Sequence, residues 1–328
     1  MAVHGSTVTS LPTDAPPEVR GRSGRPENKR SSHLKTMASR RARMGWLFIA
    51  PFIVVFVAFL LAPLGYALYL SLFTKGLATG TRFSGLENYV HAFSDPQFLN
   101  GVWFVVRFSL VLIPVQMAVS LAAALVLDHL TTKLAKFSRL MIFLPYAVPA
   151  VIGALMWGFL YSPSFGPMQQ VFSLFHASAP FLLSQDNVFY GLLNVVTWQW
   201  AGYYMIIIYA ALQGIDPSLY EAAKIDGAST RQVAFRIKVP MVSSALVLIL
   251  IFALIGTLQF FSEPQILGPV ANGSITPDFT PNIYAFNLAF GYAQFNYASA
   301  ISFSLGIVVF IAVYIFMFAT RKKGSSLS

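Results

Sequence analysis

The chain has 328 residues, of which 56% are hydrophobic and only 10% are charged. A soluble domain carries roughly 25% charged residues, because its surface faces water. Here the few charges stand in short clusters between long uncharged stretches, and the mean hydropathy is +0.65. This pattern excludes an ordinary soluble domain and predicts an outer surface that faces lipid. The lack of cysteine excludes disulfides, thiolate metal sites and a cysteine nucleophile.

Residues 1–44 form a polar, basic tail. They are rich in Ser, Pro and Arg without apolar periodicity, which predicts disorder. Nine Lys or Arg oppose three acids there, so the tail supplies +6 of the formal net charge of +10. The remaining positive charge borders apolar segments, which favours membrane topology over nucleic-acid binding. The apolar run that follows is too long for a signal peptide and is interpreted as a retained helix.

Six uncharged windows are long enough to cross a bilayer, which takes about 20 apolar residues. They predict an all-α membrane protein with six transmembrane helices. The window 279–320 is too long for one helix, and Pro281 predicts a non-spanning approach before the last span. The six spans are expected at 46–74, at 108–127, from 140 onward, within 187–215, within 239–262 and near 299–318.

Lys and Arg in the short loops predict the orientation, because cytoplasmic loops carry an excess of these residues. In a six-span arrangement, the four basic clusters all fall on one side of the membrane. Both termini are therefore expected in the cytoplasm. The clusters are Arg40, Arg41 and Arg43; Lys133, Lys136 and Arg139; Lys224, Arg231, Arg236 and Lys238; and Arg321, Lys322 and Lys323.

The loop between the fourth and fifth spans, residues 216–240, contains several helix signals. Asp216 is expected to cap a helix that begins at Pro217, and Gly227 to supply the left-handed residue that ends it. Ser229 with the glutamine three residues later predicts a capping box for a second helix. These signals predict a short helix–turn–helix. It either docks into a partner protein or is a solvated loop that connects two spans.

The same loop resembles the EAA signature of ABC importer permeases, which is spaced E-A-A-x-x-D-G-A and continues to I-x-x-P. In that family the loop is the coupling helix that docks into a groove on the ATPase subunit, so the resemblance implies this role here. The residues that carry the match are Glu221, Ala222, Ala223, Asp226, Gly227, Ala228, Phe235, Ile237 and Pro240. The resemblance implies the coupling role for the same residues except Phe235 and Ile237, with Arg231 beside them.

Other segments resemble the carbohydrate branch of these permeases, of the maltose type. They are a GLxNY-like segment at 85–89, an LPxxxP pattern at 144–149 with Trp157, the run 198–217 and the segment 298–301. The resemblance covers a permease domain at 45–320 and leaves a cytoplasmic tail at 321–328. Maltose permeases of this branch can carry extra N-terminal spans and a large periplasmic insertion, so maltose itself is not carried over.

No G-x-x-x-x-G-K-[ST] loop occurs in the sequence, so the chain is not expected to hold ATP by that route or to be an enzyme alone. It is also expected to bind no metal or cofactor, with ATP and Mg²⁺ held by partners. The resemblance implies two ATPase subunits, a second homologous permease and an extracytoplasmic sugar-binding protein. It also implies a bacterial or archaeal cytoplasmic membrane.

Polar and aromatic residues within or beside the spans are candidates for a substrate pathway, because such groups are costly in lipid. They can equally bond neighbouring helices or anchor at the interface. A di- or oligosaccharide is the expected cargo, with glycerol phosphate or a polyol as an alternative. A secondary transporter that needs no ATPase is a further alternative. The candidates are Asn194, Gln199, Trp200, Tyr203, Gln259, Glu263, Asn287 and Gln294.

Overall fold

The computed structural model describes residues 44–76, 80–129 and 133–324. Almost all of the predicted N-terminal tail lies outside these residues. The chain divides into two compact units, residues 1–63 and 64–328. In the first unit the described residues are helical and include a π-helical segment, η1, at Val57–Leu61. Their large apolar side chains, except that of Ile53, are exposed, as expected for a helix that meets lipid.

Each predicted span contains helical structure, which confirms the prediction of a helical membrane protein; the first span, predicted at 46–74, ends at Ser71 because a β-strand begins at Phe73. Five helices of the described chain are long and apolar enough to cross a membrane, and a bent pair gives a sixth. The spans are Met44–Ser71, which ends with α2 (Ala62–Ser71); α4 (Pro96–His129); the pair α5 (Lys133–Ala147) and α6 (Ala150–Leu160); α8 (Val188–Gln213); Ser243–Val270, which holds α12 (Ser243–Leu258), α13 (Ser262–Leu267) and η3 (Gly268–Val270); and α15 (Phe295–Gly324).

The third span, expected from residue 140 onward, is a bent pair of helices. Its two halves, α5 and α6, meet at 97°. Pro145 lies inside α5, and Pro149 precedes α6 in an extended conformation, with ψ at 136°. Proline removes a backbone donor and clashes with the preceding turn, and it pushes its neighbour out of the helical region. Two prolines four residues apart therefore break the span.

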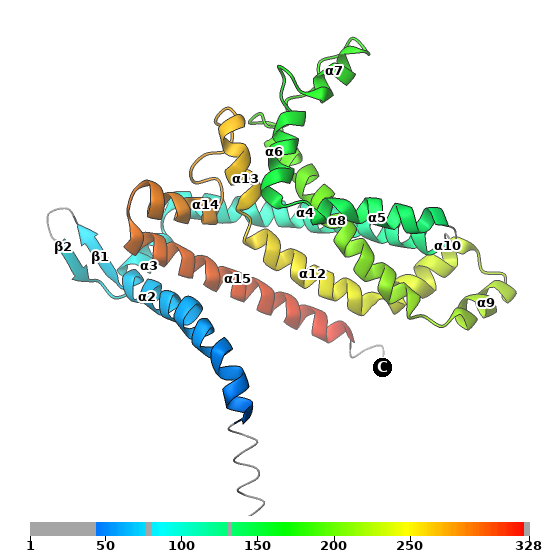
Figure 1. The fold of residues 1–328 in the computed structure, drawn as a ribbon, viewed down its shortest axis with the longest axis horizontal. Helices are drawn as coiled ribbons and strands as arrows, with labels where there is room; N and C mark the ends of the chain where they lie inside the picture. Colours follow the sequence, from blue (N-terminus) through cyan, green and yellow to red (C-terminus); the bar gives the residue numbers. More distant parts are fainter. Residues whose placement is uncertain (1–43, 77–79, 130–132, 325–328) are drawn as a thin grey trace, which may run out of the picture. The chain divides into compact units, whose positions relative to one another are not determined.

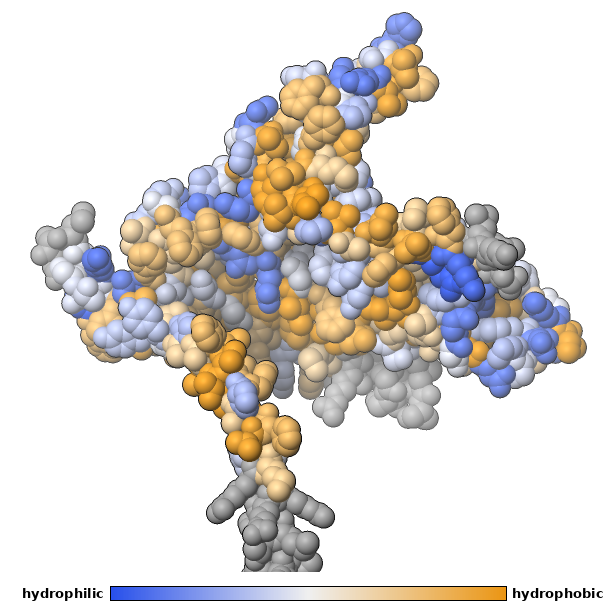
Figure 2. Space-filling view, viewed as in Figure 1, coloured by the Kyte–Doolittle hydropathy of each residue, from blue (hydrophilic) through white to orange (hydrophobic). Residues whose placement is uncertain are grey.

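Within the second unit, α4 lies along both α8 and α12, and α5 lies on α8 (Figure 1). Polar side chains of α4 join this contact, since the Gln116 Nε2 donates to the Val196 carbonyl at 3.2 Å and the Ser120 Oγ to the Ala201 carbonyl at 2.9 Å. Lipid offers no alternative partner, so buried polar groups must bond within the protein. Figure 2 shows apolar residues over the spans and hydrophilic ones gathered near α9 (Pro217–Ile225).

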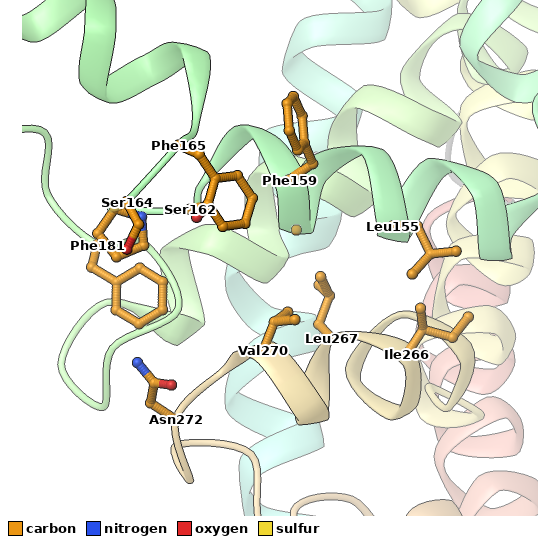
Figure 3. Close-up of a pocket in the computed structure, with 12 residues that line it drawn as sticks. Leu155, Phe159, Ser162, Ser164, Phe165, Phe181, Ile266, Leu267, Val270 and Asn272 are labelled. Carbon is orange, nitrogen blue, oxygen red and sulfur yellow. The ribbon is translucent and has the colours of Figure 1, made fainter.

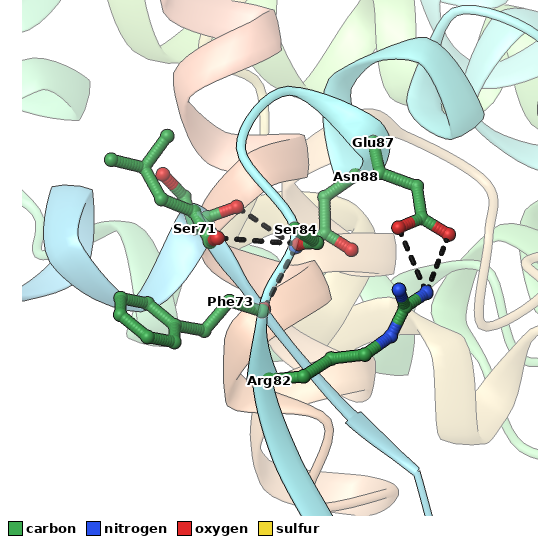
Figure 4. Close-up of polar contacts among 7 residues, drawn as sticks. Ser71, Phe73, Arg82, Ser84, Glu87 and Asn88 are labelled. Carbon is green, nitrogen blue, oxygen red and sulfur yellow. Dashed lines mark hydrogen bonds and ion pairs between the residues drawn. The ribbon is translucent and has the colours of Figure 1, made fainter. Parts of the chain in front are cut away.

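A short hairpin follows α2, formed by antiparallel β1 (Phe73–Gly76) and β2 (Gly80–Phe83). The GLxNY-like segment after it fixes the hairpin to α2 (Figure 4). Gly85 adopts a φ of +57°, which turns the chain into α3 (Glu87–Ala92). The buried Asn88 amide then donates to the carbonyls of Ser71 and Phe73, at 2.8 and 2.9 Å. This accounts physically for the Gly and the Asn of the motif.

Asp95, just before α4, is hydrogen-bonded to the non-spanning approach that precedes the last span and to the beginning of that span. That approach consists of α14 (Pro281–Phe286) and the π-helical η4 (Asn287–Gly291), in line with the predicted non-spanning segment. The buried Asp95 carboxylate accepts hydrogen bonds from the Tyr284 and Tyr297 hydroxyls at 2.8 and 2.6 Å. Burial raises the pKa of Asp95, but these bonds and one from the Gln97 amide outweigh it, so the net pKa is lowered.

We expect Asp95→Ala to destabilise the fold by about 2–3 kcal/mol, because it removes bonds to a charged acceptor and leaves the hydroxyls of the buried Tyr284 and the half-buried Tyr297 unpaired. A lowered pKa means that the carboxylate stabilises the fold above its ordinary pKa of 3.8. This stabilisation is lost as the pH falls through the folded-state value. Thermal unfolding in detergent should therefore separate wild type from variant widely at pH 7 and less at about pH 3, below the ordinary pKa of 3.8. An equal difference at both pH values would contradict this role.

Candidate functional site

The loop 216–240 has the structure that its helix signals predicted. The Asp216 carboxylate caps α9 by accepting a hydrogen bond from the Ser218 amide at 2.9 Å, which lowers the pKa of Asp216. Pro217 is the first residue of the helix. The missing amide hydrogen of proline costs nothing there.

Gly227 ends α9 with a φ of +80°. The Ala228 amide reaches back to the Ala223 carbonyl at 2.9 Å, and the Gly227 amide to Lys224 at 3.0 Å, as in a Schellman turn. Ser229 and Gln232 then form both bonds of the capping box. The segments that follow are α10 (Thr230–Val233), the π-helical η2 (Ala234–Lys238) and α11 (Val239–Met241), which contains Pro240.

The loop presents its motif outward. Glu221, Ala222, Asp226, Gly227 and Arg231 are exposed, whereas Ala223 and Ala228 are half-buried. Ile225, between the two halves of the motif, is 87% exposed. A large apolar side chain beside alanines and two exposed carboxylates forms a surface that a partner can cover. Sequence reasoning passed over Ile225, although its place inside the motif was a usable signal.

Inside the membrane-spanning part, a cavity of about 510 Å³ lies among α4, α5, α8 and α12. Such a volume suits a small ligand. The cavity brings together five of the predicted pathway residues, namely Gln199, Trp200, Tyr203, Gln259 and Glu263. Tyr204, another polar aromatic residue of the fourth span, also lines it. The cavity adds residues that the sequence did not indicate, because nothing local showed which helix faces would meet: Gln116, Tyr146, Phe252 and Thr257.

The cavity combines aromatic faces with hydrogen-bond acceptors. Tyr146 stacks on Tyr203 with ring centres 4.5 Å apart, and Trp200 meets Tyr146 edge-on at 5.4 Å. The Gln199 Oε1 is buried without a hydrogen-bond partner among the described residues, and Glu263 is buried. None of the described lining residues is Lys or Arg. The cavity therefore suits a neutral, hydroxyl-rich molecule better than an anion.

Three predicted pathway residues lie outside this cavity. The Asn194 amide donates to the Tyr161 hydroxyl at 2.7 Å, and the Asn287 amide to the Pro277 carbonyl at 2.9 Å. Both bonds join segments of the protein. Gln294 is exposed, and its backbone amide closes the turn before α15 by donating to the Leu288 carbonyl at 2.7 Å. The structure gives these three side chains no common site with the other five.

A second cavity, of about 440 Å³, lies between α6 and α13 (Figure 3). Its walls are mostly apolar, formed by residues such as Leu155, Phe159 and Leu267, with Phe165 and Phe181 from the segments on either side of α7 (Pro167–Ser173). The polar side chains on its wall are those of Ser162, Ser164 and Asn272. It lacks the amides and the carboxylate of the first cavity, so the first is the better candidate for a polar cargo.

Known proteins resemble this chain in sequence and fold. Residues 116–322 match the family of the binding-protein-dependent transport system inner membrane component. The chain is 32% identical to the lactose transport system permease protein LacF of Rhizobium radiobacter, over 85% of this chain and 94% of LacF. It is 27% identical to the diacetylchitobiose uptake system permease protein NgcF of Streptomyces coelicolor, over 94% of this chain and 89% of NgcF.

A solved structure supports the fold. A chain of a bacterial alginate ABC transporter, in complex with an alginate pentasaccharide-bound periplasmic protein, superimposes with a TM-score of 0.75. It is 22% identical and covers 86% of this chain and 96% of its own length. The matched family region contains the loop 216–240 and most of the cavity wall. The chain is therefore a member of the binding-protein-dependent transport system inner membrane component family.

Proposed function

We propose that this chain is the membrane-spanning permease subunit of an ATP-driven importer for a neutral di- or oligosaccharide. The observation that carries the proposal is the cavity, whose aromatic faces can lie against sugar rings while Gln199 and Glu263 accept hydrogen bonds from hydroxyls. The relatives LacF and NgcF are named for lactose and diacetylchitobiose, both uncharged saccharides, and this supports the cargo class.

The chain would work within an assembly. One of two ATPase subunits, which bind ATP and Mg²⁺, would dock on α9, and a second permease of the same fold would complete the pore and receive the other ATPase subunit. An extracytoplasmic binding protein would deliver the sugar. In this arrangement α9 and both termini face the cytoplasm of a bacterium or archaeon. ATP binding would move α9 and shift the spans between inward- and outward-facing states by differential binding energy. The chain itself would not be an enzyme.

The charge of the cargo distinguishes a sugar importer from a glycerol phosphate importer. The second alternative needs a test because UgpA of Salmonella typhimurium, a relative named for sn-glycerol-3-phosphate transport, is 30% identical over 69% of this chain. We expect proteoliposomes with the whole assembly to import neutral saccharides such as lactose or diacetylchitobiose with ATP, and not glycerol phosphate. Glu263→Gln should weaken sugar uptake by about tenfold, since a bond to a charged acceptor contributes about 1.5–3 kcal/mol.

The matched control is Glu87→Gln, which changes an exposed carboxylate outside the cavity and should leave uptake unchanged. ATP-driven uptake of glycerol phosphate alone would overturn the cargo class. Uptake of sugar without ATP would instead support a secondary transporter.

A further inference from the structure

A buried ion pair joins the segment after the coupling loop to the second span. Asp128 stands one residue before the end of α4, and Lys238 is the last residue of η2. Their side chains form a salt bridge and are only 8% and 5% exposed. These residues are 110 positions apart in sequence, so the pair links two distant elements. A buried ion pair is costly to desolvate and does not by itself stabilise a fold. The feature that distinguishes this pair is that it connects η2 to the end of α4.

The same carboxylate also holds a third element. The Gln213 amide, at the last residue of α8, donates to the free oxygen of Asp128 at 2.8 Å. Asp128 therefore ties the ends of α4 and α8 to η2 through both of its oxygens. The two helices that it holds are the ones whose other side chains line the cavity, through Gln116 of α4 and Gln199 of α8.

The coupling helix itself contacts the pair from the other side. Tyr220 of α9 lies with its ring over the Lys238 ammonium, 4.8 Å from the ring centre. This is a cation–π distance. Its hydroxyl is buried and has no hydrogen-bond partner among the described residues. Tyr220 therefore contacts Lys238 through its ring and not through its hydroxyl. A cavity of about 300 Å³ beside these groups is lined by residues of α9 and of the end of α4.

We propose that Tyr220, Lys238 and Asp128 form a mechanical joint that transmits movement of α9 to α4 and α8, and thus to the cavity. The three are positioning residues, since they touch neither ATP nor sugar. The proposal rests on the proposed function, in which an ATPase moves α9. A displaced α9 pushes the Tyr220 ring against Lys238, and the ion pair carries that displacement to α4 because neither charge can leave its partner inside the protein without a large penalty.

The test uses the paired neutral variant Asp128→Asn with Lys238→Met, which leaves no unpaired buried charge. A cysteine introduced at Phe252, on the cavity wall, reports the state of the cavity by its labelling rate with a water-soluble maleimide; the chain has no native cysteine. In the reconstituted assembly, adding ATP with vanadate should change this rate by about fivefold or more in the reference protein. In the paired variant the ATP-dependent change should be lost while basal ATP hydrolysis continues.

Tyr220→Leu serves as a second variant in case the paired variant fails to assemble, since it keeps the ion pair and an apolar side chain on α9. It should reduce the ATP-dependent change by about threefold. The control is Arg82→Met with Glu87→Gln, which neutralises an exposed ion pair (Figure 4) and should change nothing. A full ATP response in the variants that assemble would overturn the joint. No response in the reference protein would instead overturn the proposed ATP-driven function, and the joint with it.

Discussion

Glu221→Ala is expected to reduce ATP-driven sugar import by about tenfold or more, which corresponds to about 1.4 kcal/mol of lost coupling free energy. Glu221 is an exposed carboxylate in the middle of α9. Alanine is the strongest helix former, so α9 should keep its structure, and its caps at Asp216 and Gly227 are untouched. The variant loses one negative charge on the surface of α9 that, in our proposal, contacts the ATPase subunit.

The measurement compares import per ATP hydrolysed, together with co-purification of the ATPase, in wild type and variant. Glu87→Ala is the matched control, because it removes an exposed glutamate from another short helix, where a surface ion pair contributes about 1 kcal/mol at most. Normal import by Glu221→Ala would show that the proposed coupling role is wrong. Loss of the ATPase from the purified complex would instead show that Glu221 acts mainly in docking.

Local structure could be predicted well from the sequence, since its causes are neighbouring residues. The cap at Asp216, the turn at Gly227 and the box at Ser229 each depend on contacts within about six residues, and all three are present. The spans were equally predictable, because a bilayer imposes length and apolarity on each segment alone. The hairpin at 73–83 was missed, since its first strand is held by a side chain outside the hairpin, the Asn88 amide, which donates to the carbonyls of Ser71 and Phe73.

The cavity was only partly predictable. Intramembrane polarity selected Gln199, Gln259 and Glu263, which do share it. Polarity alone could not separate them from Asn194, whose amide joins α8 to Tyr161. Nor could it select Tyr146, because that residue reaches the cavity through the packing of α5 on α8. Which polar group faces a cavity and which faces a helix depends on how helices pack, and this information is not local.

Close helix packing also gives Gly202 a role that the sequence did not reveal. Gly202 is a buried residue of α8 that faces α5. A Cβ atom added there would lie 2.7 Å from the Ile142 carbonyl carbon and 2.9 Å from the Phe143 Cα, closer than the 3.0 Å that real Cβ atoms keep. These are backbone atoms in a helix, so they cannot turn away as a side chain can. Small residues allow such close approach between membrane helices.

Gly202→Ala should therefore force α5 away from α8 and destabilise the fold by about 2–3 kcal/mol. The matched control is Gly306→Ala in α15, where an added Cβ meets nothing within 4 Å, so better helix propensity should leave stability unchanged or raised by up to about 1 kcal/mol. Thermal unfolding in detergent, followed by the fraction of monodisperse protein, measures both. Because Tyr146 and Trp200 meet across the same interface, Gly202→Ala should also open the cavity and lower sugar affinity in assemblies that survive. Equal thermal-unfolding midpoints for Gly202→Ala and Gly306→Ala would contradict the close contact of α5 with α8.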